Sequence, residues 1–262
     1  MRFVFIGTIL YIMKSMVITS GKGGVGKTTV TAGLGRAIAA LGKRVALIDA
    51  DFGLNNLDVV LEKENRVVYD IADVIDNRCR VRQALIECDR NLFFLPSAHG
   101  YLGEKVTAQN IKVILNSLAV TFDYALVDCP AGIEAGFTRA VGACECALVV
   151  TTPHISALRD ANKVIALLLS YNIAPSVVVN RVRGDLLAHR QIPSMDEIEN
   201  ILKTRVDGVI PETDGVYKSE MPQKPFELLA KRLVYGTGEP LDPAAGYRGF
   251  LGGIKQIFRR RG

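Results

Sequence analysis

The sequence predicts an α/β fold in which helices cover both faces of a doubly wound, mostly parallel β-sheet. Short apolar runs alternate with longer segments of helical periodicity over most of the chain, which is typical of βαβ units. Within the short runs, apolar residues follow one another without polar alternation, as expected for strands that are buried on both sides. The length of 262 residues and the 49% hydrophobic content fit one large domain with a sizeable core.

The expected elements follow one another in a regular order. The runs that predict strands are Val17–Thr19, Val45–Asp49, Leu92–Leu95, Tyr124–Asp128, Ala147–Thr151, Ser176–Asn180 and Asp207–Ile210. The segments that predict helices are Thr28–Ala40, Gln109–Val120, Ser156–Leu169 and Met195–Lys203. Loops therefore follow the carboxyl ends of the strands, where α/β proteins bind their ligands.

The two ends of the chain are expected to lie outside a main domain at 16–235. Residues 1–15 indicate either an N-terminal extension or an over-extended start, with Met13 and Met16 as the alternative first residues. Their apolar run is about half the ~20 residues that a membrane span needs. Glycine and proline are frequent at 236–246, which predicts a linker before a final amphipathic helix at 247–262.

Charge and cysteine content narrow the classes of partner and compartment. A net charge of +5 is too small to indicate nucleic-acid binding by itself. The five cysteines are odd in number and lack the spacing of metal ligands. A reducing, cytoplasmic compartment is therefore expected.

A glycine-rich loop between the first strand and the first helix predicts a phosphate-binding site. The residues expected to contact a nucleotide here are Gly23, Gly24, Val25, Gly26, Lys27, Thr28 and Thr29. Lys27 supplies a cation to the β- and γ-phosphates, and the Thr28 hydroxyl is a ligand for Mg²⁺. The alternative is a glycine-rich turn that binds nothing.

A second lysine, Lys22, makes this loop unusual. With Lys22 the loop resembles the deviant Walker A motif of the MinD/ParA ATPases, which implies a P-loop NTPase fold and Mg²⁺-dependent hydrolysis of ATP. In that family the extra lysine reaches across a dimer interface to the partner's nucleotide. The resemblance therefore implies an ATP-dependent homodimer, with Lys22 and Lys27 both in the catalytic site. An exposed loop lysine without a role is the alternative for Lys22.

Three aspartates at strand ends complete the expected catalytic site. Asp49 ends the second strand and Asp51 follows it, and the resemblance assigns Asp51 to positioning the attacking water and Asp49 to the outer shell of Mg²⁺. Asp128 ends a strand as the Walker B aspartate does, so it is expected on the metal side. A solvated turn or a helix cap is the alternative for the first two. Cys129 is expected to be a small buried residue rather than a ligand of an iron–sulfur cluster.

An adenine pocket is expected at the ends of two later strands. Asn180 can pair with adenine through its amide donor and acceptor, beside Arg181. The backbone at Pro211 and Glu212 can complete the pocket, to which the resemblance assigns both segments. Two ordinary strand-end loops are the alternative.

The C-terminal segment predicts a membrane anchor. Its apolar residues fall on one side of a helix, and three arginines end the chain, which indicates an anionic lipid surface. The expected membrane-binding residues are Tyr247, Phe250, Leu251, Ile254, Ile257, Phe258, Arg259, Arg260 and Arg261. One such tail should bind weakly and two on a dimer far more tightly. A core helix and a helix docked on a partner protein are the alternatives.

This tail, together with the stretches at 49–58 and 128–134, resembles the MinD branch of the family. The branch implies placement of the division septum by membrane-bound dimers that recruit the inhibitor MinC, which opposes FtsZ assembly, under the control of MinE or a polar scaffold. The implied location is the cytoplasm and the inner face of the cell membrane, or its plastid equivalent. A ParA-type DNA-segregation ATPase and a flagellar-number regulator are the alternatives. His154 stands where the branch usually has an acidic residue, and it receives no role.

Overall fold

The computed structural model describes residues 13–52, 56–98, 106–212 and 223–247. Within these ranges, eight strands form one sheet in the order β3-β4-β2-β5-β1-β6-β7-β8. Only β3 runs antiparallel to its neighbour, and the other neighbouring strands in the described ranges are parallel. The predicted mostly parallel sheet is therefore confirmed.

The strands are β1 (Lys14–Thr19), β2 (Val45–Asp49), β3 (Ile86–Asp89), β4 (Leu92–Leu95), β5 (Tyr124–Asp128), β6 (Cys146–Thr151), β7 (Pro175–Val182) and β8 (Gly208–Pro211). The longer helices are α1 (Lys27–Ala40), α5 (Ala108–Leu118), α6 (Ala135–Val141), α7 (Ile155–Ser170), α9 (Met195–Leu202) and α10 (Gln223–Tyr235). The short helices are α2 (Leu57–Val60), η1 (Glu64–Arg66), α3 (Ile71–Ile75), α4 (Val81–Ala84), α8 (Gly184–Ala188) and η3 (Ala245–Tyr247).

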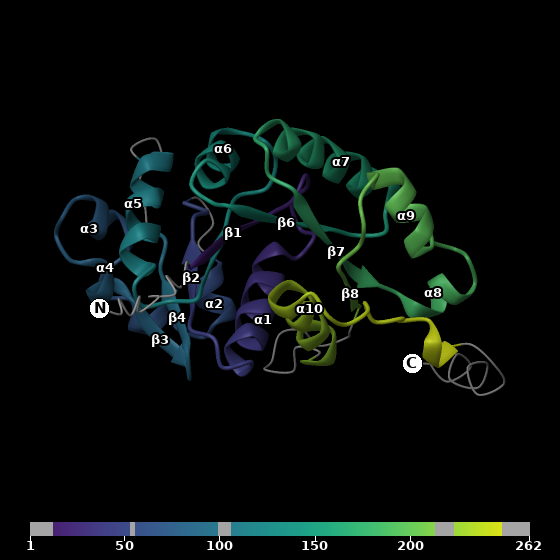
Figure 1. The fold of residues 1–262 in the computed structure, drawn as a ribbon, viewed down its shortest axis with the longest axis horizontal. Coiled ribbons are helices and arrows are strands. Elements are labelled where there is room, and N and C mark those ends of the chain that lie inside the picture. Colours follow the sequence, from purple (N-terminus) through teal and green to yellow (C-terminus); the bar gives the residue numbers. More distant parts are fainter. Residues whose placement is uncertain (1–12, 53–55, 99–105, 213–222, 248–262) are drawn as a thin grey trace, which may run out of the picture.

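Helices cover both faces of the sheet, as Figure 1 shows. Apolar residues of α5, α6, α7 and α9 pack with one set of strand side chains, and those of α1, α2 and α10 pack with the other set. On β1, Val17 belongs to the first cluster and its neighbours Met16 and Ile18 to the second. Because successive strand residues face opposite sides, a strand covered on both faces must be apolar throughout.

The first strand is longer than its run of apolar residues predicts. The sequence predicts a strand only from Val17, but β1 begins at Lys14, whose N–H donates to the carbonyl of Asp123 over 2.9 Å. The Ser15 hydroxyl accepts a hydrogen bond from the N–H of Glu145 over 3.1 Å. These two residues join the sheet through backbone and hydroxyl hydrogen bonds, which hydropathy does not register.

Several elements were not predicted from the sequence. β3 is a short edge strand whose residues alternate between half-buried and exposed, so it lacks the apolar run of the central strands. The helix α10 packs against α1, where the ring of Phe226 lies directly over Gly33. A Cβ atom at Gly33 would come within 2.5 Å of Phe226 Cζ, so this close approach requires glycine.

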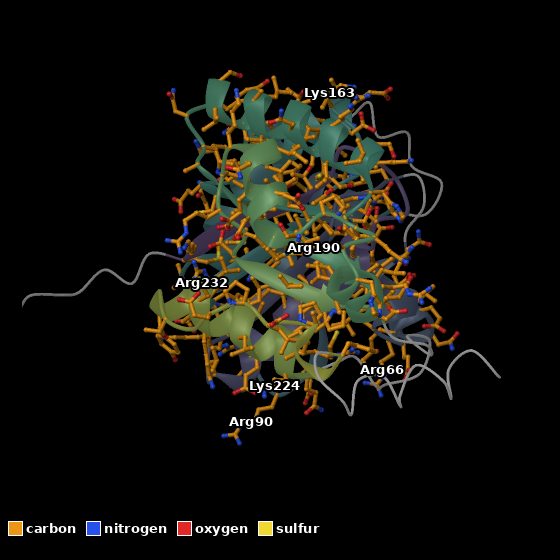
Figure 2. All side chains as sticks on the ribbon, turned by 90° about the vertical axis from the view of Figure 1, so that its right-hand side faces the viewer. Arg66, Arg90, Lys163, Arg190, Lys224 and Arg232 are labelled. Carbon is orange, nitrogen blue, oxygen red and sulfur yellow. The ribbon has the colours of Figure 1, made fainter. Side chains whose placement is uncertain are left out.

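The predicted linker at 236–246 packs against the domain. Arg232 on α10 is labelled in Figure 2. Its Nε donates to Asp207 Oδ1 over 3.0 Å, and its Nη1 donates to the carbonyl of Gly238 over 2.8 Å. Farther along, Ala244 is completely buried. The chain also passes so close to Gly184 that a Cβ atom there would lie 2.1 Å from the Pro243 carbonyl oxygen. These contacts tie the segment to α10 and α8.

The predicted membrane anchor falls almost wholly outside the described residues, which end at Tyr247. The ring of Tyr247 lies against Gly184, so this residue is half-buried on the domain. The predicted anchor residues from Phe250 to Arg261, and residues 1–12 of the predicted extension at 1–15, lie outside the described residues. In the part of the chain that the structure describes, no helix is long and apolar enough to cross a membrane.

Candidate nucleotide-binding site

The phosphate loop connects β1 to α1 through left-handed backbone at two glycines. Gly24 has φ of 76° and Gly26 has φ of 93°, and residues other than glycine rarely adopt these values. Gly26 is the N-cap of α1 and has no side chain to bond the first N–H groups of the helix. These donors and the helix dipole therefore favour an anion at this point.

Two buried aspartates lie side by side below the loop. Asp49 on β2 and Asp128 on β5 are register partners on neighbouring strands, and each is 2% exposed. Burial, followed by the charge of Asp128, raises the pKa of Asp49 to about 8. Burial also raises the pKa of Asp128 to about 6, although hydroxyl hydrogen bonds and the charge of Lys27 oppose the rise.

The hydrogen-bond partners of these carboxylates differ. Asp49 accepts the N–H of Asp51 over 3.0 Å and the N–H of Leu57 over 3.4 Å. Asp128 accepts the hydroxyl of Thr31 over 3.2 Å and also the hydroxyl of Thr28. The sequence reasoning missed Thr31, which lies one helical turn after Thr28 and so shares its face of α1.

This set of oxygen atoms fits a magnesium ion. Two carboxylates and the Thr28 hydroxyl are hard ligands of the kind that Mg²⁺ prefers, and their burial costs free energy unless a cation compensates the charge. Among the described residues, no group of three His, Cys, Asp or Glu side chains could hold a metal alone. A magnesium ion here would thus need further oxygen ligands, which phosphates and water usually supply.

Asp51 lies near this pair, as the sequence predicts. Its negative charge raises the pKa of both Asp128 and Asp49, and its backbone carbonyl accepts the Ser97 hydroxyl over 3.3 Å. Cys129 beside Asp128 is completely buried, and burial raises the pKa of its thiol to about 12. The prediction of a buried Cys129 is confirmed.

A pocket beside the loop brings several predicted nucleotide-binding residues together. Among the residues that line it are Lys22, Gly23, Gly24, Val25, Arg181 and Glu212. His154 at the start of α7 and Arg183 also line this pocket, and neither was assigned to it from the sequence. Pro211 ends β8 immediately before Glu212. The strand ends predicted to form the adenine site therefore meet the phosphate loop in space.

Asn180 occupies a different place. It is 6% exposed, and its side-chain Nδ2 donates to the carbonyl of Val25 over 2.8 Å. The next residue, Arg181, lines the pocket beside the loop. Asn180 is not among the described residues that line this pocket. The side chain predicted to read adenine thus contacts the phosphate loop.

Comparison with known proteins places these features in a family. Residues 16–226 match the family described as the CobQ/CobB/MinD/ParA nucleotide binding domain. A relative from Guillardia theta, described as a putative septum site-determining protein MinD, is 44% identical over 259 residues, which cover 93% of this chain and 96% of the relative. The septum site-determining protein MinD of Bacillus subtilis is 41% identical over 262 residues, covering 94% and 98%.

Solved structures show the same fold. The MinC:MinD cell division protein complex of Aquifex aeolicus contains a chain that is 39% identical, with a TM-score of 0.79 over 87% of this chain and 98% of that one. The septum site-determining protein MinD of Pyrococcus horikoshii, complexed with Mg-ADP, is 27% identical, with a TM-score of 0.76 over 85% and 96%.

Proposed function

The chain belongs to the CobQ/CobB/MinD/ParA family of nucleotide-binding proteins, and from this membership we propose that it places the division septum as a membrane-associated dimer. It is a P-loop ATPase that uses Mg²⁺, and its relatives are named as septum site-determining proteins. The observation that carries the proposal is the exposed Lys22, which lines the pocket beside the phosphate loop.

In this proposal each residue of the catalytic site has its own task. The backbone N–H groups of the loop and Lys27 hold the phosphates, and Thr28 and Asp128 hold Mg²⁺, which neutralises the charge that develops during transfer. Asp49 supports the metal through its outer shell. Asp51, near both buried carboxylates, orients the attacking water. Lowering the barrier depends on this positioning more than on covalent chemistry.

Lys22 acts on a second protomer. It is exposed and lines the pocket next to Gly23 and Gly24, so its ammonium can reach phosphates held by another chain. Because those phosphates are fully present only with ATP, the dimer forms with ATP and separates after hydrolysis. Arg181 and Glu212 belong to the adenine side of the same pocket, and Pro211 precedes Glu212 at the end of β8.

The tail converts dimerisation into membrane residence. Partial insertion of one amphipathic segment yields little after the cost of ordering it, so a monomer binds weakly. Two tails on one dimer engage the same surface, and the second engagement gains from high effective concentration, with an enhancement of roughly 10²–10⁴. The ATPase is therefore peripheral on the inner face of the membrane only while it holds ATP.

MinC is the proposed protein partner. A MinD that is 39% identical to this chain forms a solved complex with MinC, and this likeness supports the same partnership here. The membrane-bound dimer concentrates MinC, which opposes FtsZ assembly away from the division site. A MinE-type activator or a polar scaffold sets where ATP is hydrolysed.

Sedimentation with anionic liposomes tests the proposal. The full-length chain and MinC should both sediment with ATP and Mg²⁺, and both should stay in the supernatant with ADP. MinC without the ATPase is the control. Retention on DNA with ATP, and none on liposomes, would instead indicate a ParA-type segregation ATPase. Liposome binding that is equal with ATP and ADP would contradict the dimer switch.

A further inference from the structure

A buried hydroxyl on the first helix lies against one of the two aspartates. Thr31 on α1 is completely buried, and its Oγ1 lies 3.2 Å from Asp128 Oδ1 and 3.0 Å from the carbonyl oxygen of Lys27. Asp128, at the carboxyl end of β5, is buried as well. Because both groups are shielded from solvent, water does not compete for the hydrogen bond between them.

The single proton of this hydroxyl has two acceptors within reach. In an α-helix the carbonyl of residue i accepts the N–H of residue i+4, so the Lys27 carbonyl has a backbone partner in Thr31 itself. An ionised Asp128 is the stronger acceptor, since hydrogen bonds to a charged group are shorter and stronger than neutral ones. The hydroxyl therefore donates to Asp128 when that carboxylate carries its charge.

Two hydroxyls on the same face of α1 hold this carboxylate. Thr28 also donates to Asp128, and it lies three residues before Thr31, a spacing that puts both side chains on one face of the helix. The torsion that turns an aspartate carboxylate has only broad minima, so one hydrogen bond leaves its plane free to rotate. Two donors on one rigid helix fix that plane.

We propose that Thr31 is a positioning residue that fixes the Asp128 carboxylate in the orientation in which it holds Mg²⁺. Mg²⁺ demands near-ideal octahedral geometry, so its affinity depends on how firmly each oxygen ligand is held in place. Hydrogen-bond partners of metal-binding carboxylates contribute roughly 10–100-fold to metal affinity. The proposal rests on the metal role of Asp128 proposed above and does not depend on septum placement.

Removing the hydroxyl should affect only the part of nucleotide binding that comes from the metal. Thr31→Val keeps the shape of the side chain and should reduce the gain in ADP affinity that Mg²⁺ brings by about tenfold. ADP affinity in EDTA should stay unchanged, because loop N–H groups and the Lys27 ammonium hold the phosphates without the metal. Thr31→Ser keeps the hydroxyl and should restore the gain.

Isothermal titration of the full-length chain with ADP, once in excess Mg²⁺ and once in EDTA, measures both affinities. Ser117→Ala on α5 is the matched control, since it removes a hydroxyl that donates to a carbonyl of its own helix, that of Ile114, over 2.7 Å. This control should leave both affinities unchanged.

Three results would contradict the reasoning, and they can be told apart. A Thr31→Val protein that loses ADP affinity equally in Mg²⁺ and in EDTA would show a merely structural role, and one with an unchanged Mg²⁺ gain would show no role. Either result would overturn the proposal for Thr31. A parent protein whose ADP affinity does not rise with Mg²⁺ would overturn the metal site itself.

Reduced folding of a variant does not obscure the answer. The two affinities are measured on one preparation, and the binding stoichiometry reports the folded fraction. Thr31→Ala and Thr31→Ser supply a second comparison, because they differ by one oxygen atom. The Mg²⁺ gain should be about tenfold smaller in the alanine variant, and equal gains in the two would refute the role of the hydroxyl.

Discussion

Asp49→Asn should stabilise the nucleotide-free protein at alkaline pH, although it alters the catalytic site. Burial and the charge of Asp128 raise the pKa of Asp49 from 3.8 to about 8, so the folded protein keeps a proton that the unfolded chain releases. The stability from this group is fully present below pH 3.8 and is lost as the pH rises through 8. Asparagine has no charge to bury and avoids that loss.

The magnitude decides the sign of the effect. One retained proton is worth up to about 1.4 kcal/mol per pH unit, so the parent should lose roughly 1.5 kcal/mol of unfolding free energy between pH 6.5 and 8. Against this, the amide can keep only one of the two backbone hydrogen bonds to Asp49. The one it loses, from Leu57 over 3.4 Å, is long and costs ~1 kcal/mol or less at either pH. The free energy of unfolding of Asp49→Asn should therefore rise relative to that of the parent as the pH rises.

Urea unfolding in EDTA without nucleotide, followed by circular dichroism at pH 6.5 and 8, measures this gain. Glu87→Gln removes an exposed carboxylate on β3 and is the control, which should leave the pH dependence of the parent unchanged. With Mg²⁺ and ADP added, the parent should gain more stability than the variant, since a bound cation favours the charged carboxylate. A stability difference between Asp49→Asn and the parent that is equal at both pH values would refute the reasoning.

Three further substitutions test the roles of Lys22 in the phosphate loop, of Asp51 and of the C-terminal segment. Lys22→Ala should leave ATP affinity within about threefold and abolish the ATP-dependent dimer in light scattering; a persistent dimer would exclude the role across the interface. Asp51→Ala should lower phosphate release by about two orders of magnitude while the dimer persists, and undiminished turnover would remove Asp51 from the mechanism. Ile254→Glu should abolish sedimentation with anionic liposomes at an unchanged melting temperature, whereas a large fall in melting temperature would indicate a buried helix.

The bounds of several central strands could be predicted from local runs of apolar residues. The predicted ranges Val45–Asp49, Leu92–Leu95 and Tyr124–Asp128 coincide with β2, β4 and β5, because strands covered on both faces need continuous apolar runs. The edge strand β3 and the helix α10 escaped prediction. The residues of β3 alternate only between half-buried and exposed, so they form no apolar run. The position of α10 depends on the contact of Phe226 with Gly33.

The sequence by itself determined the chemistry of the site, since a glycine loop with two lysines and aspartates at strand ends are local patterns. Only the tertiary structure decided that Asp49 and Asp128 are register partners and that the Thr31 hydroxyl bonds Asp128. It also decided that Asn180 bonds the loop 155 residues away. Local patterns follow from backbone geometry and hydropathy, which act between neighbours. Pairing of distant polar atoms follows from how the whole sheet packs, because β-strand order and register have no local signature.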